Sequence, residues 1–576
     1  MTEQLGGSWQ SLPAMMLGLA ATQPDRVLAR FWRERSWQAL RWGAFATQVA
    51  GVAAGLQRLG VMPGDRVLLV SENRPEFLIA DNAIMAVGGI TVPTYTTNTL
   101  ADHAHVLRDC GARLAIVSTA ALAAQVVTAA GDGGIDTLVC MDEPPPCPAG
   151  IQGVHWPDLA ATPADAAALI AEVEHIPAGR LACLIYTSGT GGAPKGVMLP
   201  HRALLSNTAG IRPLLAPLVK PGDCYLSFLP MSHSYEHTVG GFILPSMGME
   251  IVFSRGADRI ASEMAEFGPV VLTAVPRLFE VLRARIQGQA EKEAGWKKRL
   301  FDQALALGLR RLDGSRLGLL ERLQDAVLDR LVREKVRARF GGRLRAMVSG
   351  GARLDPDLSG FFLALGLPVI QGYGQTEAGP VISVNLPSFN DRRTVGRPLA
   401  GVAARIAEDG ELLVQGGLVM DGYWGNPDAT AAALRPLADG GIWLHTGDVG
   451  RIDDAGRISI TDRKRDFIKL VGGDMIAPAK LEALLMAEPE IAQAVIAGEG
   501  QPGILALIVP AEGQASKVEA AVKRVNGKLA SIERIRRWKT LDEPFTIENG
   551  LLTASMKVKR RAVLERHASV LFSLQK

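Results

Sequence analysis

The segment IYTSGTGGAPKGVM, residues 185–198, is the most informative part of the chain. An apolar run is followed by a loop of hydroxyl residues and glycines, and then by Pro-Lys-Gly. Glycines let backbone N–H groups approach an anion closely, while hydroxyls and a lysine add hydrogen-bond donors. Pro194 precedes Lys195 where a Walker A loop requires glycine, and Gly196 follows where that loop requires serine or threonine. We therefore predict a polyphosphate-binding loop that follows a buried strand and differs from Walker A.

Strand and helix patterns alternate on the N-terminal side of this loop. We predict helices over residues 42–59 and 77–87, and a turn followed by a short strand over residues 63–70. Further short strands are predicted over residues 90–92, 114–117 and 137–141. Such alternation is typical of parallel sheets covered by helices on both faces. The predicted fold class is therefore α/β, a large domain of parallel or mixed sheets flanked by helices.

The predicted pattern of secondary structure changes twice in the C-terminal third of the sequence. After about residue 397, short strands and glycine turns predict a small β-barrel-like part. Beyond residue 465 we predict a first strand and then a helix over 479–487, strands over 492–497 and 504–509, and a helix over 516–530. A loop and a last helix are expected to follow. These roughly 110 residues have the size of a small α+β domain.

Composition excludes several classes of protein. The 576 residues are 48% hydrophobic and 21% charged, and the net charge is only +3, so neither a disordered chain nor a nucleic-acid-binding protein is indicated. Five irregularly spaced cysteines predict neither a disulfide framework nor a CxxC metal site. No membrane span or secretory signal is visible, so we expect a cytoplasmic protein, with peripheral contact at the inner face of the membrane as an alternative.

The loop and five further signatures resemble the adenylate-forming (AMP-binding) superfamily, which includes acyl-CoA synthetases, luciferases and peptide-synthetase adenylation domains. YTSGTGGAPKG is similar to the phosphate loop, with Gly191 where the family usually has a second threonine. The other signatures follow in the family's order: SGGARL (349–354), GYGQTEAG (372–379), WLHTGD (443–448), DRKRD (462–466) and LLTASMKVKR (551–560). The resemblance extends from about residue 15 to 565.

The resemblance implies ATP, Mg²⁺ and coenzyme A as reactants or cofactors, and a role for individual side chains. Tyr373 is expected to lie against adenine, Asp448 to bind the ribose hydroxyls and Thr376 to contact the α-phosphate. Glu377 and Thr187 are expected to bind Mg²⁺, which prefers oxygen ligands. The residues expected to bind ATP or AMP are Thr187, Ser188, Gly189, Thr190, Gly191, Lys195, Gly350, Gly351, Ala352, Gln371, Gly372, Tyr373, Gly374, Thr376, Asp448 and Arg463.

The resemblance also implies catalytic residues and a moving domain. The expected catalytic residues are Lys557, Glu377, Lys195 and Arg463. A large domain over 1–462 and a small mobile domain over 466–576 are expected to be joined by a hinge over 463–465. The remaining expected positions are His233 and Gly374 in the substrate pocket, Arg465 at the hinge, and Gly472 and Gly473 in the CoA channel.

The helical segment at 291–345 and the SHSYEH segment at 232–237 resemble the long-chain fatty acyl-CoA synthetase branch. The expected reaction is ATP-dependent activation of a medium- or long-chain fatty acid as acyl-adenylate, followed by transfer to the thiol of coenzyme A. One alternative is a fatty acyl-AMP ligase that loads a carrier protein, and another is a nonenzymatic protein whose phosphate loop is impaired at Gly191. The chain is expected to be a monomer or homodimer.

Other patterns leave further alternatives. His233, Glu236 and His237 fit the H-x-x-E-H pattern of a zinc hydrolase. GEGQPG at 498–503 fits a dinucleotide motif but leads into a strand, so we predict a hairpin turn. His103 and His105 are predicted to be exposed. The segment 291–345 carries fifteen basic and eight acidic residues, which predicts a solvated helical face, with contact with anionic lipid as the alternative.

Overall fold

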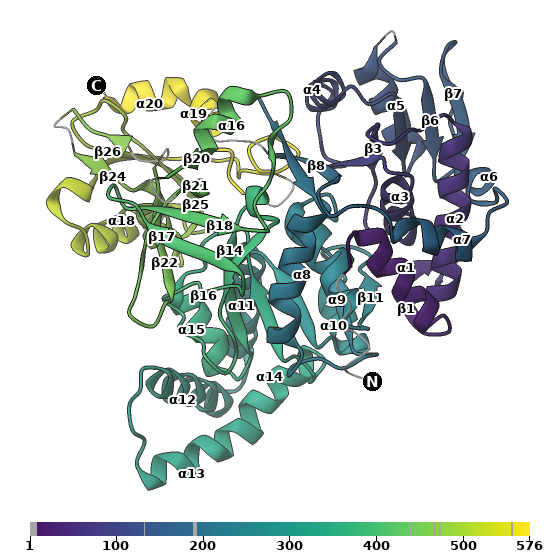
Figure 1. Ribbon diagram of the computed structural model, residues 1–576. Coiled ribbons are helices and arrows are strands. Elements are labelled where there is room, and N and C mark those ends of the chain that lie inside the picture. Colours follow the sequence, from purple (N-terminus) through teal and green to yellow (C-terminus); the bar gives the residue numbers. More distant parts are fainter. Residues whose placement is uncertain are drawn as a thin grey trace.

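The computed structural model in Figure 1 describes residues 9–131, 133–187, 193–437, 440–464, 468–471, 474–553 and 557–575. Two large sheets, a smaller sheet and a C-terminal α+β unit follow one another along the chain. None of the helices in these ranges is long and apolar enough to span a bilayer. The predicted α/β class is correct.

The first large sheet contains the strand that leads into the predicted phosphate loop. In spatial order its strands are β19 (Gly422–Tyr423), β9 (Lys195–Pro200), β8 (Leu181–Thr187), β4 (Ile90–Thr94), β3 (Arg66–Val70), β5 (Leu114–Val117), β6 (Thr137–Cys140) and β7 (Gln152–His155). Pairing is parallel from β8 to β7, as the alternating pattern predicts, and antiparallel where β9 joins β8 and β19. Its helices are α2 (Trp42–Arg58), α3 (Pro75–Ala86), α4 (Leu100–Cys110), α5 (Ala120–Ala130), α6 (Trp156–Ala160) and α7 (Ala166–Val173).

The second large sheet packs beside the first through a shared apolar core. Its strands in spatial order are β16 (Arg397–Pro398), β15 (Val381–Val384), β14 (Val369–Gly374), β13 (Ala346–Ser349), β12 (Val271–Ala274), β10 (Cys224–Ser227), β11 (Glu250–Phe253), β1 (Val27–Arg33) and β2 (Ser36–Arg41). The accompanying helices are α1 (Leu12–Thr22), α8 (His201–Leu215), the π-helix η2 (Glu236–Ile243), α9 (Leu244–Ser246), α10 (Ile260–Phe267), α11 (Pro276–Lys292) and α15 (Pro356–Ala364).

The third sheet is the small β-rich part that was predicted after residue 397. It consists of β17 (Val402–Ile406), β18 (Glu411–Gly416), β21 (Ile442–Ile452), β20 (Leu434–Pro436) and β22 (Ile458–Arg463), with α16 (Pro427–Ala433) beside it. All its pairings are antiparallel. Since β22 ends at Arg463, the first residue of the predicted hinge is still part of this sheet.

The helical segment projects from the lower edge of the molecule in Figure 1 as α12 (Gly295–Leu312) and then α13 (Leu319–Leu328), which continues through the π-turn η3 (Asp329–Arg333) into α14 (Glu334–Arg339). Arg333 is completely buried and connects the helical segment from α12 to α14 to the main body. Its guanidinium donates to the carbonyl oxygens of Ala304, Asp325 and Ala364 and to the Asp325 carboxylate. Because every one of these donors has an acceptor, the burial of the charge is compensated.

The C-terminal unit has an apolar core of its own, made by residues between Ile468 and Leu574. Its elements are β23 (Ile468–Lys469), β24 (Met475–Ile476), α17 (Pro478–Met486), β25 (Ile491–Ala497), β26 (Ile504–Pro510), α18 (Val518–Gly527), β27 (Ile535–Thr540), α19 (Arg560–Arg566) and α20 (Ala568–Gln575). GEGQPG joins the antiparallel strands β25 and β26, so the predicted hairpin is confirmed. The strand β27 lies where we predicted a loop, because its pattern IRRWKT buries few side chains.

Candidate functional site

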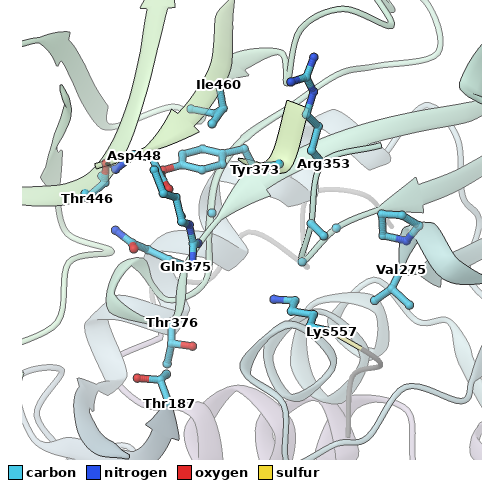
Figure 2. Close-up of a pocket in the computed structure, with 18 of the residues that line it drawn as sticks. Thr187, Val275, Arg353, Tyr373, Gln375, Thr376, Thr446, Asp448, Ile460 and Lys557 are labelled. Atoms are coloured by element: carbon cyan, nitrogen blue, oxygen red, sulfur yellow. Dashed lines mark hydrogen bonds and ion pairs between the residues drawn. The ribbon is translucent and has the colours of Figure 1, made fainter. Parts of the chain in front are cut away.

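One cavity of about 1910 Å³ lies between the two large sheets, the small β-rich sheet and the C-terminal unit. Figure 2 shows part of its lining, with side chains from β8, β14, β21 and the C-terminal unit converging on it. Every predicted site residue within the described ranges lines this cavity, namely Thr187, Lys195, His233, Gly350, Gly351, Ala352, Gln371, Gly372, Tyr373, Gly374, Thr376, Glu377, Asp448, Arg463 and Lys557. The other predicted positions, Ser188, Gly189, Thr190, Gly191, Arg465, Gly472 and Gly473, lie outside the described residues.

A polar network joins three strands along one wall of the cavity. Tyr373, near the end of β14, donates its phenol hydrogen to Asp448 Oδ2 at 2.6 Å. Asp448 on β21 and Arg463 on β22 are register partners, and the Arg463 Nε donates to Asp448 Oδ1 at 2.8 Å. Burial raises the pKa of Tyr373, so the phenol stays protonated as a donor. The backbone geometry of the two sheets therefore holds a carboxylate and an aromatic ring side by side.

Gly374 follows Tyr373 at a point where the backbone is crowded. A Cβ at this position would lie 1.8 Å from the carbonyl oxygen of Pro380. Only glycine allows the two segments to approach so closely. The sequence motif GYGQTEAG thus has a structural requirement for its second glycine.

A second group of contacts lies near the end of β8. The Tyr423 hydroxyl donates to Glu377 Oε1 at 2.8 Å, and the Lys195 ammonium lies 4.9 Å from the centre of the Tyr423 ring. Ser234 Oγ lies 2.9 Å from the hydroxyl of Thr376. Tyr423 and Ser234 were missing from the predicted site. Ser234 lies beside the predicted His233, whereas Tyr423 reaches the site only because β19 pairs with β9, which is a long-range contact that no local pattern reveals.

Lys557 reaches the cavity from the C-terminal unit (Figure 2). Its backbone N–H donates to the Thr553 hydroxyl at 3.0 Å, and its carbonyl accepts from the Thr553 N–H at 2.7 Å. Its ammonium packs against the loop of Gly351, where an added Cβ would be 3.7 Å from Nζ. Burial, and to a lesser degree the charge of Arg463, lower the pKa of Lys557 to about 8. Lys557 is thus partly buried, and its desolvated ammonium faces the same cavity as Asp448.

The three side chains of the H-x-x-E-H segment do not converge on a common metal-binding position. Glu236 is fully buried and accepts hydrogen bonds from Ser227 Oγ at 2.7 Å and Thr273 Oγ1 at 2.8 Å, and burial raises its pKa to about 7. His237 Nε2 lies 3.0 Å from Asp81, whereas His233 faces the cavity. Within the described ranges, no three His, Cys, Asp or Glu side chains are placed to hold a metal. The geometry does not support the zinc alternative.

The expectation of two exposed histidines on α4 is wrong. His103 is completely buried, and burial lowers its pKa. His105 is partly buried, and its Nε2 lies 2.7 Å from the carbonyl oxygen of Pro194, next to the phosphate loop. Helix α4 turns both rings toward the protein because it packs on the first sheet and contacts β9, which a short polar sequence did not reveal.

The cavity also has an apolar part. Its lining there comes from α8, η2, α9, β12 and β15, with Ile211, Leu214, Leu215, Val239, Leu244, Val271 and Val381. Polar and apolar groups in one cavity suit a ligand with a charged end and a hydrocarbon end.

Comparison with known proteins gives a consistent result. A family model described as AMP-binding enzyme matches residues 19–424, and one described as AMP-binding enzyme C-terminal domain matches residues 465–574. The long-chain-fatty-acid–CoA ligase FadD15 of Mycobacterium tuberculosis is 35% identical over 98% of this chain and 96% of its own. The long-chain-fatty-acid–CoA ligase 5 of Mus musculus is 30% identical over 85% of this chain and 77% of its own.

Solved structures show the same fold at lower identity. The anthranilate CoA ligase AuaEII in complex with anthranoyl-AMP superposes with a TM-score of 0.72 at 19% identity, covering 99% of both chains. The adenylation domain of a carboxylate reductase from Mycobacterium chelonae gives a TM-score of 0.73 at 20% identity, covering 99% of this chain and 92% of that one. With the two family models together covering most of the sequence, the chain belongs to the AMP-binding enzyme family.

Proposed function

We propose that this chain is an ATP-dependent fatty acyl-CoA synthetase that first forms an acyl-adenylate and then transfers the acyl group to coenzyme A. The observation that carries the proposal is the composition of the cavity. It contains the network of Tyr373, Asp448 and Arg463, the desolvated ammonium of Lys557, and an apolar part that suits a hydrocarbon chain. The relatives named as long-chain-fatty-acid–CoA ligases favour a long-chain acid.

In this proposal the network wall binds the nucleoside. The Tyr373 ring offers a face for adenine, and the Asp448 carboxylate accepts from the ribose hydroxyls. Lys195, Thr376 and the N–H groups of the glycine loop bind the phosphates. Oxygen donors of Glu377 and Thr187 line the same cavity and suit Mg²⁺, which would neutralise phosphate charge when bound.

The chemistry of the first step requires charge stabilisation rather than a protein nucleophile. The fatty acid carboxylate attacks the α-phosphorus of ATP, the bond to the β-phosphate oxygen breaks, and pyrophosphate leaves. Negative charge spreads over the phosphate oxygens in the transition state, so positioned cations lower its energy. We assign this role to Lys557, which would contact both the carboxylate and the α-phosphate.

The second step requires the same carbonyl to become accessible to a thiol. The thiol of coenzyme A attacks the acyl carbonyl, and AMP leaves as the bond to the phosphate oxygen breaks. Lys557 lines the cavity and lies beside Gly351 in this structure, so we propose that a small domain over 466–576 rotates relative to a large domain over 1–462 between the steps. The hinge at 463–465, with Arg465 as its pivot, and a CoA channel at Gly472 and Gly473 remain part of this proposal.

Acid-dependent ATP–pyrophosphate exchange tests the function directly. Purified protein is assayed with fatty acids of increasing chain length and with aryl and amino acids as controls, and CoA is then added. We expect exchange with long-chain fatty acids and stoichiometric acyl-CoA after CoA addition. Exchange without turnover on CoA would support the carrier-protein alternative, and no exchange with any acid would contradict the proposal.

A further inference from the structure

The helix that projects furthest from the body has an uncovered apolar face. From α13 to α14 it is continuous over 319–339, roughly 30 Å at 1.5 Å per residue. Leu319, Leu320 and Leu323 are 84%, 83% and 66% exposed, and Val327 and Leu331 are also exposed. Four of the five follow a spacing of four residues, which places them along one side of the helix. This stripe of 319, 320, 323, 327 and 331 is called the leucine stripe below.

The acidic residues of this helix are paired inside the helical segment from α12 to α14. Glu321 accepts from Arg310 of α12 at 2.6 Å, and Asp325 is bound by Arg311 and by the buried Arg333. Asp329 pairs with Arg337 at 2.9 Å. These acids are therefore paired with basic residues, and the pairs with Arg310 and Arg311 also hold α13 against α12.

The basic residues around the leucine stripe remain available. Arg316, Arg322, Arg330 and Lys335 are exposed and have no ion pair among the described residues, whereas Glu334 is the single exposed acid between residues 316 and 335 without one. The net charge of +7 counted over 291–345 is thus distributed unevenly, with the acids paired inward and unpaired cations facing solvent beside the leucine stripe. The mixed charge of the sequence conceals this separation.

We propose that the leucine stripe and its flanking cations form a docking surface for an anionic lipid bilayer. Exposed leucines enter the interface between headgroups and acyl chains, while arginine and lysine contact the lipid phosphates. A second copy of the same surface would bring like charges together, so the charge pattern disfavours self-association. The buried anchor at Arg333 keeps the helix oriented before it meets a membrane. The proposal does not depend on which acid the enzyme activates.

Vesicle sedimentation with the full-length protein tests the surface. The probes are vesicles of phosphatidylcholine alone and of phosphatidylcholine mixed with phosphatidylglycerol. We expect binding to the mixed vesicles that weakens with salt, and weak binding to phosphatidylcholine. The triple variant Arg316→Gln, Arg322→Gln, Arg330→Gln should bind about a hundredfold more weakly, since each basic residue near an anionic surface contributes roughly a fivefold effect.

The matched variant of the stripe is Leu319→Gln, Leu320→Gln, Leu323→Gln, which keeps good helix formers. We expect at least about a tenfold loss of binding, because the apolar burial is removed. The charge control is Lys517→Gln, just before α18, combined with Lys523→Gln on α18, and the control for apolar area is Met62→Gln, at a residue that is 64% exposed elsewhere on the protein. Both controls should bind as the unaltered chain does.

A gain-of-signal measurement guards against variants that merely misfold. Leu323→Cys, in a Cys147→Ser background because Cys147 is the partly exposed native thiol, is labelled with an environment-sensitive dye. Its emission should increase with mixed vesicles, while the same dye at Met62→Cys should not respond. Failure of the unaltered chain to bind mixed vesicles, full binding by both triple variants, or a stripe that proves to dimerise the chain in gel filtration would each overturn the proposal.

Discussion

The two walls of the cavity are held in place by different means. Asp448 and Arg463 are register partners on the neighbouring strands β21 and β22, and Tyr373 reaches Asp448 from β14 of the second large sheet. Lys557 lies on a short loop of the C-terminal unit, closed by a bridge between Leu552 and Val558, and it becomes partly buried only by meeting the body at Gly351. The network of Tyr373, Asp448 and Arg463 is therefore fixed by the sheets of the main body, whereas the position of Lys557 depends on how the C-terminal unit meets that body.

Replacing Lys557 should produce the largest effect. In Lys557→Ala, the carboxylate and the α-phosphate lose a positioned cation, and comparable losses of a transition-state donor cost about a hundredfold to a thousandfold in rate. Fatty-acid-dependent ATP–pyrophosphate exchange measures this step. Lys559→Ala, two residues further along the chain at the start of α19, is the matched control and should keep most of the exchange activity.

Replacing Asp448 in the network with Tyr373 and Arg463 should have a smaller effect, which appears in the KM for ATP. Asp448→Asn removes the charged acceptor from the Tyr373 phenol and the Arg463 guanidinium, and hydrogen bonds to charged groups contribute about 1.5–3 kcal/mol. We expect the KM for ATP to rise by tens-fold or more, in both the exchange and the overall reaction. Tyr373→Phe, which keeps the ring, should change it by about tenfold or less.

The pH dependence of the adenylation rate should report on Lys557. The pKa of Lys557 is lowered to about 8, so its ammonium loses the proton as pH rises through that value. Adenylation should fall about tenfold per pH unit above it. Lys557→Arg keeps its charge there, so its adenylation rate, though lower, should stay flat over the same range. An unaltered chain with no decline up to pH 10 would contradict the assigned role of the lysine.

The weakest expected effect concerns the bridge at Tyr423. Its hydroxyl donates to Glu377 and its ring lies beside Lys195, so it orients both groups. Tyr423→Phe keeps the ring and removes one hydrogen bond, worth about 1 kcal/mol. We expect a several-fold rise in the Mg²⁺ concentration that supports half-maximal exchange, with the KM for the fatty acid unchanged. A change in the fatty acid KM alone would assign Tyr423 to the other end of the cavity.

The same contrast explains what the sequence could predict. The parallel strands, the helices and the hairpin at 498–503 follow local patterns, and the signatures indicated the residues that line the cavity. Tyr423 was missed because it depends on pairing between strands more than two hundred residues apart, and the burial of His103 depends on packing of α4. The strand β27 was missed because it lies at the edge of its sheet, and its consecutive Arg536 and Arg537 interrupt the alternation of apolar and polar residues. Long-range contacts determined the differences at Tyr423 and His103, whereas the polar pattern of an edge strand determined the one at β27.

In the proposed mechanism, Lys557 acts in the adenylation step and is absent from the thioester step. The direct measurement is the rate at which Lys557→Ala converts supplied acyl-adenylate and CoA into acyl-CoA, compared with the unaltered protein. We expect this variant, which has lost fatty-acid-dependent exchange, to form acyl-CoA at a rate within a few-fold of that of the unaltered protein. Equal loss of both half-reactions would contradict it.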